Sequence, residues 1–126
     1  MTAVSSSLPE ILVVDDDAGT RSAVADALDA RGYRVAEARD GEEALRCVAQ
    51  SVPQLILLDI WMPTLDGWGF ARTLRERYGR RIPLVVMTAG ESSQLRADEI
   101  GANADLGKPL QLDRLYDVVA DLIGAP

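Results

Sequence analysis

The chain has 126 residues, 48% of them hydrophobic and 26% charged, a composition typical of one globular domain. Its net charge of −7 argues against nucleic acid and anionic membrane surfaces as direct partners, because both bind clustered cations, and no apolar run is long enough to span a bilayer. One cysteine excludes an internal disulfide, and the absence of histidine excludes Ser-His-Asp and Cys-His catalysis and histidine-ligated zinc. We therefore expect a cytoplasmic protein whose acid chemistry depends on carboxylates.

The first part of the chain alternates apolar runs with segments of helical period. Residues 1–8 are small and polar and are expected to form a flexible lead-in to one domain over residues 9–124. Ile11–Val14 is predicted to be a buried strand, and a helix is expected over Ala18–Arg31. Tyr33–Ala38 alternates with polar residues, which is typical of an edge strand.

The middle of the chain continues the same alternation. Asp40 and Glu43 form a capping-box pattern that predicts a helix over Gly41–Gln50. Gln54–Leu58 is predicted to be the third strand, and the helix after the turn at Gly67 is expected to extend to about Tyr78.

The remaining elements are predicted to be a strand over Leu84–Met87, a helix over Glu91–Ile100, a weak strand over Ala104–Gly107 and a helix over Gln111–Ile123. The last helix is amphipathic, and its expected inward residues are Leu112, Leu115, Val119 and Leu122. Five strand–helix pairs with short connections predict an α/β fold in which a parallel sheet carries helices on both faces.

Polar residues lie at the predicted carboxyl ends of four of these strands. Asp15 and Asp16 follow the first strand, Asp59 the third and Thr88 the fourth, and Lys108 lies at the end of the fifth. Because ligands of open parallel sheets bind beyond the carboxyl ends of the strands, all five are expected at one edge. Lys108 is also the single lysine beside twelve arginines, and a lysine ammonium suits one phosphate oxygen.

Three acids at one edge repel one another unless a cation lies among them. Two charges 4 Å apart cost about 4 kcal/mol at an effective dielectric of about 20. Lys108 supplies one positive charge, and Mg²⁺ fits the acids best because it uses few carboxylates and bridges to phosphate oxygens. A carboxylate can also attack phosphorus and form an aspartyl phosphate.

Four motifs now show a resemblance to a known family. They are Ile-Leu-Val-Val-Asp-Asp-Asp, Leu-Leu-Asp-Ile-Trp-Met-Pro-x-Leu-Asp-Gly, Val-Val-Met-Thr-Ala and Gly-Ala-x-x-x-Leu-x-Lys-Pro-Leu. In this order and spacing the chain resembles the CheY-like receiver domain of bacterial two-component response regulators, over about residues 9–124. The resemblance implies a flavodoxin-like (βα)5 doubly wound fold with a parallel five-stranded sheet in the strand order 2-1-3-4-5.

The resemblance also implies roles for individual residues. Asp59 corresponds to the phosphoacceptor, and Asp16 and Asp59 to direct ligands of Mg²⁺ or Mn²⁺. Asp15 corresponds to an acid that acts through a metal-bound water, and the backbone carbonyl of Trp61 to the remaining protein ligand. In the family, residues at the positions of Thr88 and Lys108 contact the phosphoryl group.

One position departs from the family pattern. The family usually has Tyr or Phe three residues before the lysine, where this chain has Asp105. The usual coupling between the threonine and that aromatic ring is therefore absent.

The implied function is a signalling switch. The chain would accept a phosphoryl group from a histidine kinase or a histidine phosphotransfer protein and change its surface for a partner or output domain, without turnover on small substrates.

Two other functional classes are weighed against this one. A Mg²⁺-dependent phosphatase of the haloacid-dehalogenase type needs a second acid two residues after the nucleophile, where this chain has Trp61. A phosphorylation-independent, receiver-like interaction module is the alternative that Asp105 favours.

Some charged residues near these motifs are expected to be structural only. Asp17 is interpreted as a helix cap or an exposed acid. The arginines at positions 72, 75, 77, 80 and 81 are predicted to form a solvated helix end.

Overall fold

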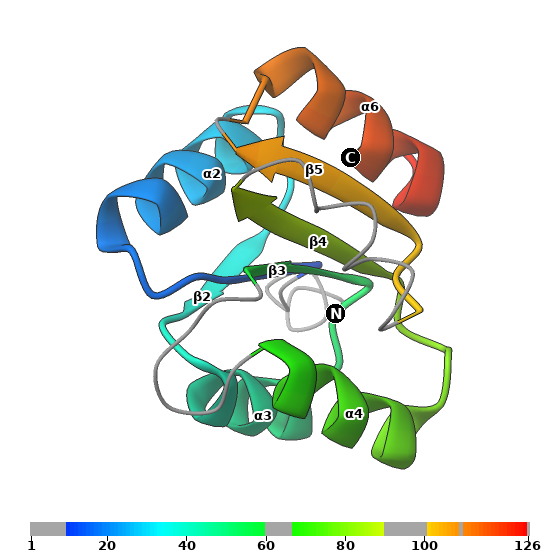
Figure 1. Cartoon of the computed structure of the whole chain (residues 1–126). Helices are drawn as coiled ribbons and strands as arrows, with labels where there is room; N and C mark the ends of the chain where they lie inside the picture. The colour runs from blue at the N-terminus through cyan, green and yellow to red at the C-terminus, as the bar shows by residue number, and fades with distance from the viewer. Residues whose placement is uncertain (1–9, 60–66, 90–100, 109, 126) are drawn as a thin grey trace, which may run out of the picture.

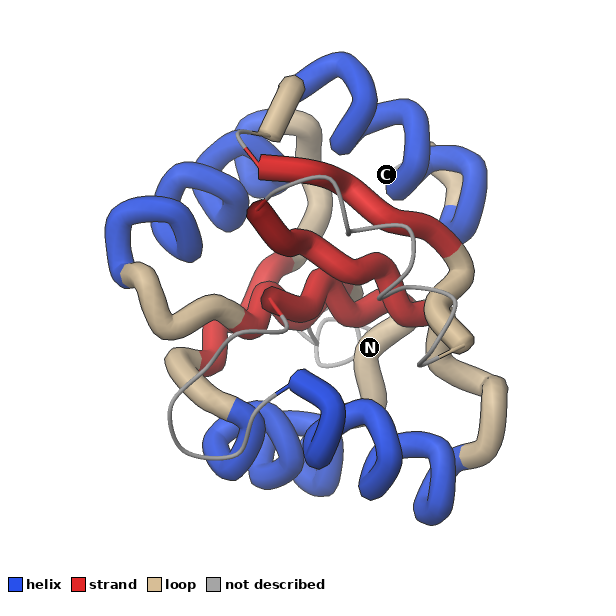
Figure 2. The backbone as a smooth tube through the Cα atoms, viewed as in Figure 1, coloured by secondary structure: helices blue, strands red, loops and turns tan. Residues whose placement is uncertain are grey.

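The structure is a computed structural model that describes residues 10–59, 67–89, 101–108 and 110–125. Within these ranges five strands form one sheet between helices, as Figures 1 and 2 show. In chain order the elements are β1 (Ile11–Val14), α2 (Ala18–Ala30), β2 (Val35–Ala38), α3 (Gly41–Gln50), β3 (Leu55–Asp59), α4 (Gly67–Tyr78), β4 (Leu84–Ala89), β5 (Ala104–Lys108) and α6 (Leu112–Ile123).

The sheet is parallel throughout, and its strand order is β2-β1-β3-β4-β5. This confirms the predicted order and the predicted edge position of β2. The expected helix over Glu91–Ile100 lies outside the described residues. None of the helices that the structure describes is long and apolar enough to cross a membrane.

Each face of the sheet has its own apolar core, because successive strand residues point to opposite faces. On one face, alternate residues of β1 and β3 pack against α3 and α4, with Phe70 and Leu74 fully buried. On the other face, the intervening residues pack against α2 and α6, through Leu28, Leu115 and Val119. Figure 1 shows these two helix layers on opposite sides of the sheet. Burial on both faces explains why β1 and β3 are continuous apolar runs.

The predicted capping residues act at the starts of α2 and α3. The side chain of Asp17 accepts a hydrogen bond from the backbone N–H of Thr20 (2.9 Å) and caps α2. The side chain of Asp40 accepts one from the N–H of Glu43 (2.8 Å) and caps α3. After α2, Gly32 has a φ of 99°, a left-handed conformation that glycine adopts without strain.

Three sequence-based details are wrong. β4 extends to Ala89, so Thr88 lies within the strand and not after it. Leu112 is 51% exposed, because it is the first residue of α6 and the helix meets the core only at Leu115. Arg75 is not a solvated side chain: its guanidinium donates to the carbonyls of Gly79 (3.3 Å), Ile82 (3.0 Å) and Gly101 (3.1 Å).

Candidate functional site

The register of the sheet brings two of the predicted acids to adjacent strand ends. Val14 of β1 pairs with Leu58 of β3, so the next residues, Asp15 and Asp59, lie beside each other. Both are buried, with exposed fractions of 0% and 5%, and they are the only buried charged residues in the part of the chain that the structure describes. Burying a carboxylate is costly, and the position of these two at the ligand-binding edge indicates use in a site.

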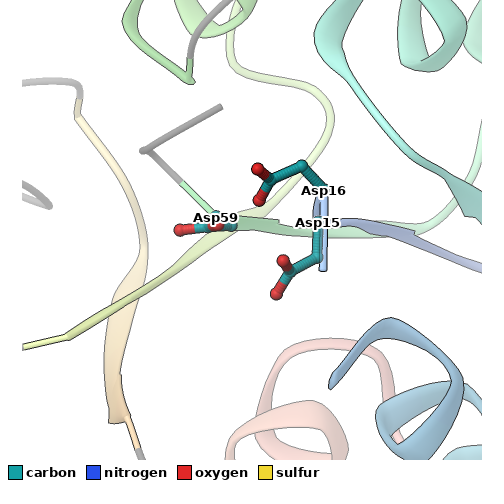
Figure 3. Close-up of side chains that lie close together, drawn as sticks. All are labelled: Asp15, Asp16 and Asp59. Atoms are coloured by element: carbon teal, nitrogen blue, oxygen red, sulfur yellow. The ribbon is translucent and has the colours of Figure 1, made fainter. Parts of the chain in front are cut away.

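Asp16 completes an acidic cluster with these two residues. One carboxylate oxygen from each of Asp15, Asp16 and Asp59 lies within 4.8 Å of the others, and Asp16 is exposed to solvent. Figure 3 shows the three carboxyl groups gathered at the ends of β1 and β3. The convergence that the sequence predicted for these three residues is therefore confirmed.

The acidic cluster is electrostatically unfavourable by itself. Two unit charges 4.8 Å apart, which is the upper limit for these oxygens, repel by about 3.5 kcal/mol at an effective dielectric of about 20. Three converging carboxylate oxygens are the hard donors that Mg²⁺ and Mn²⁺ prefer, and two of them approach from buried positions while the third faces solvent. The donor set thus fits a divalent cation that keeps some of its water.

The backbone of β4 and β5 extends the same edge of the sheet. Asp59 pairs with Met87, and the next residue along β4, Thr88, pairs with Gly107 of β5. Lys108 follows Gly107 and pairs with Ala89. The backbone of Lys108 therefore lies at the end of β5, as predicted, and that of Thr88 lies one residue before the end of β4. Trp61 lies outside the described residues.

Asp105 lies on β5 in register with Val86 of β4. Val86 is fully buried, and Trp68 of α4 and Ala102 pack against it. Asp105 is half-buried at this place in the sheet.

One residue near the acidic cluster, Arg21 of α2, was not predicted from the sequence. Its guanidinium donates to the backbone carbonyl of Asp15 at 2.9 Å and forms an ion pair with Glu37 of β2 at 3.1 Å. An arginine in the second turn of a helix has no distinctive sequence signal. Its pairing partners lie six and sixteen residues away, so only the fold brings them together.

The chain is similar to known proteins over most of its length. The sequence profile of the response regulator receiver domain matches residues 11–120. The response regulator MprA of Mycolicibacterium vanbaalenii is 42% identical over 107 residues, which are 83% of this chain and 46% of MprA. MprA of Mycobacterium leprae is 42% identical over 115 residues, 90% of this chain and 50% of that protein. The chain thus spans about half the length of the curated relatives it matches.

Solved structures agree with this similarity. The chemotaxis protein CheY4 of Vibrio cholerae superposes with a TM-score of 0.84 at 27% identity, covering 92% of this chain and 99% of that chain. The receiver domain of NtrX from Brucella abortus gives a TM-score of 0.83 at 30% identity, covering 90% and 97%.

Proposed function

Since the chain belongs to the response regulator receiver domain family, and is therefore not a turnover enzyme on small substrates, we propose that it accepts a phosphoryl group on Asp59. The observation that carries this proposal is the cluster of Asp15, Asp16 and Asp59 at the ends of β1 and β3. Family membership implies a cognate histidine kinase as the partner. A histidine phosphotransfer protein is the second class of donor, and the 126 residues contain no histidine of their own.

The chemical step is a transfer from nitrogen to oxygen. A carboxylate oxygen of Asp59 attacks the phosphorus of the donor's phosphohistidine, and an O–P bond forms as the P–N bond breaks. The electron pair of that bond remains on the imidazole nitrogen, which takes up a proton from solvent. Water then attacks the phosphorus of the acyl phosphate and the O–P bond to Asp59 breaks, which releases inorganic phosphate, regenerates the Asp59 carboxylate and ends the signal.

The acidic cluster would hold Mg²⁺, or Mn²⁺ in its place. We assign direct ligation to Asp16 and Asp59, a water-mediated contact to Asp15, and one further ligand to the backbone carbonyl of Trp61. When bound, the cation neutralises charge on the transferring phosphoryl oxygens. Asp15 and Asp16 orient the site around the reacting oxygen of Asp59, and the burial of Asp15 and Asp59 restricts the approach of water.

Thr88 and Lys108 would contact the phosphoryl oxygens. Their backbone positions, one residue before the end of β4 and at the end of β5, lie toward the same edge of the sheet as Asp59. A threonine hydroxyl donates one hydrogen bond, and a lysine ammonium adds a positive charge opposite the phosphoryl group.

We assign the phosphoaccepting domain to residues 9–124, and we propose that it acts in the cytoplasm. The lead-in expected over residues 1–8 lies outside the described residues. The output would come from a downstream protein or a further domain, since the curated relatives are about twice as long as the matched region. We propose no direct contact with nucleic acid or membrane for this domain, whose net charge is −7.

A second candidate function has one observation in its favour. Asp105 lies half-buried beside Val86, where the family usually has an aromatic ring. A receiver-like module that binds its partner without phosphorylation would be consistent with that substitution.

Incubation with acetyl phosphate and Mg²⁺, followed by intact mass, tests the proposal. Wild type is expected to gain one phosphoryl group, and Asp59→Asn none. Asp17→Asn is the matched control, because Asp17 is the neighbouring acid that caps α2. If wild type stays unmodified under conditions that label another receiver domain, phosphoacceptance is rejected and the phosphorylation-independent interaction module is favoured.

A further inference from the structure

The turn between β1 and α2 carries two of the acids and is held by a series of hydrogen bonds. The backbone N–H of Asp17 donates to Oδ1 of Asp15 (2.9 Å), which fixes the direction of that carboxylate. The N–H of Asp15 donates to the carbonyl of Ala38 on β2 (3.1 Å). Asp17 in turn accepts hydrogen bonds from the N–H and the hydroxyl of Thr20.

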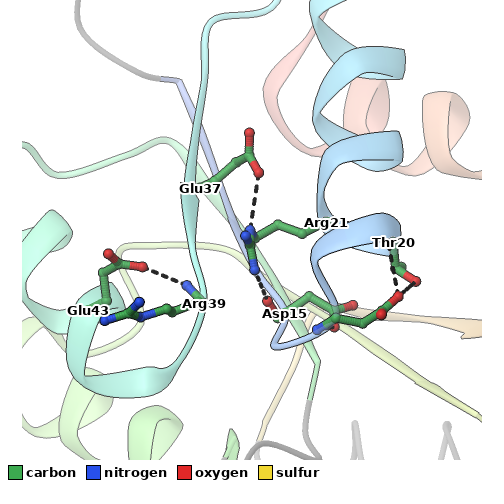
Figure 4. Close-up of polar contacts among 7 residues, drawn as sticks. Asp15, Thr20, Arg21, Glu37, Arg39 and Glu43 are labelled. Carbon is green, nitrogen blue, oxygen red and sulfur yellow. Dashed lines mark hydrogen bonds and ion pairs between the residues drawn. The ribbon is translucent and has the colours of Figure 1, made fainter.

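Arg21 joins this turn to β2 through its side chain. Nη1 of Arg21 donates to the carbonyl of Asp15 at 2.9 Å, and Nε lies 3.1 Å from Oε1 of Glu37. Figure 4 shows the guanidinium between these two partners. The backbone N–H of Arg21 also donates to the carbonyl of Asp17 at 2.9 Å, so Arg21 contacts both ends of the acidic turn.

The two side-chain contacts require the shape of an arginine. Nε and Nη1 are fixed in one planar group, so the ion pair with Glu37 determines where Nη1 meets Asp15. A lysine ammonium at this position could reach one partner but could not reproduce both directions. The side chain of Arg21 is only 18% exposed, so packing limits its other orientations, whereas that of Glu37 is 41% exposed and is held mainly by the ion pair.

We propose that Arg21, oriented by Glu37, is a positioning residue that holds the Asp15–Asp16 turn in the geometry needed to bind a divalent cation. This inference rests on the proposed function of the acidic cluster. Arg21 acts through the backbone of Asp15 and is not assigned a contact with the cation or the phosphoryl group.

Charge and geometry predict opposite results for the loss of Arg21. Removing a positive charge near three acids would strengthen cation binding. Releasing the turn would weaken it, and loss of a residue that orients metal ligands typically costs about 10- to 100-fold in affinity. Because the charge of Arg21 is paired with Glu37 and partly screened, we expect geometry to dominate, with a loss of about tenfold.

Calorimetric titration with Mg²⁺ alone, without phosphate donor, tests the proposal. Both Arg21→Ala and Arg21→Lys are expected to raise the Kd for Mg²⁺ about tenfold. Glu37→Gln, whose amide oxygen can still accept from Nε, is expected to raise it less. The matched control is Arg34→Lys, because Arg34 pairs with Glu10 (3.7 Å) near the start of β2, away from the acidic turn.

The midpoint of urea unfolding without Mg²⁺ separates positioning from general stability. Positioning predicts that Arg21→Lys loses Mg²⁺ affinity while its unfolding midpoint stays near that of wild type. A lower unfolding midpoint with unchanged Mg²⁺ affinity would show that Arg21 has a structural role only. Wild-type affinity in Arg21→Lys, together with tighter Mg²⁺ binding in Arg21→Ala, would show that Arg21 affects the site only through its charge. Either result overturns this inference while phosphorylation of Asp59 still stands. If Arg21→Ala does not fold, the Mg²⁺ affinities of Arg21→Lys and Glu37→Gln test the proposal. Absence of saturable Mg²⁺ binding in wild type would instead reject the cation site and this inference together.

Discussion

Arg75 provides the most quantitative stability prediction, because its guanidinium joins three separate parts of the fold. It donates to the carbonyls of Gly79 after α4, Ile82 before β4 and Gly101 before β5, at 3.0 to 3.3 Å. Burial and the neighbouring Arg80 lower the pKa of Arg75. Its Nε is buried and has no hydrogen-bond partner among the described residues, which offsets part of the gain.

The expected change in the free energy of unfolding follows from these contacts. Three hydrogen bonds from a charged donor contribute about 1.5 kcal/mol each, and the unpaired Nε costs about 2 kcal/mol. Arg75→Met is therefore expected to lower the free energy of unfolding by about 2 to 3 kcal/mol. With an unfolding entropy of about 2.1 cal/mol/K per residue over 126 residues, the Tm should fall by about 8 to 11 °C.

Urea unfolding followed by circular dichroism, with a parallel thermal scan, measures this change. Arg77→Met is the matched control, because Arg77 lies on the same helix turn and is exposed, and it should stay within about 0.5 kcal/mol of wild type. Equal stability of the Arg75 and Arg77 variants would refute the role given to the three carbonyl contacts.

Three further outcomes are expected. Burial, followed by Glu10 and opposed by Arg31, raises the pKa of Tyr33 above 10.0, so the stability that this shift contributes is complete below pH 10 and is lost at higher pH. As the pH rises above 10, the urea midpoint of Tyr33→Phe should therefore fall less than that of wild type. Parallel curves of midpoint against pH for the two proteins would contradict this. Burial and Glu43 raise the pKa of the Cys47 thiol, so iodoacetamide should alkylate it more slowly at pH 8 in the folded chain than in urea, and equal rates would show an unshielded thiol. Mg²⁺ should raise the Tm of wild type more than that of Asp16→Asn, and an equal rise would place the cation elsewhere.

The sequence predicted the sheet and the acidic cluster because both depend on short-range patterns. Continuous apolar runs marked β1 and β3 as strands buried on both faces, and an acid directly after such a run had to lie at the ligand-binding edge. Capping residues such as Asp17 and Asp40 act on their own next turn, so their roles were also predictable.

The errors come from contacts made over long distances in the sequence. Arg75 was grouped with exposed arginines because nothing in the sequence around it shows that the carbonyl of Gly101 comes within 3.1 Å. Arg21 was missed for the same reason, since Glu37 reaches it only through the pairing of β1 with β2. Leu112 fits the apolar period of α6, but the period cannot show where along the helix contact with the sheet begins.

The most direct test of phosphoacceptance by Asp59 is to map the phosphorylated residue. Wild type treated with acetyl phosphate and Mg²⁺ is reduced with borohydride, which converts an aspartyl phosphate to homoserine, and the peptides are sequenced by mass spectrometry. Phosphoacceptance by Asp59 predicts homoserine at position 59 alone, and only when Mg²⁺ is present. Homoserine at another aspartate, or a phosphate that resists reduction because it is attached to a hydroxyl group, would contradict it.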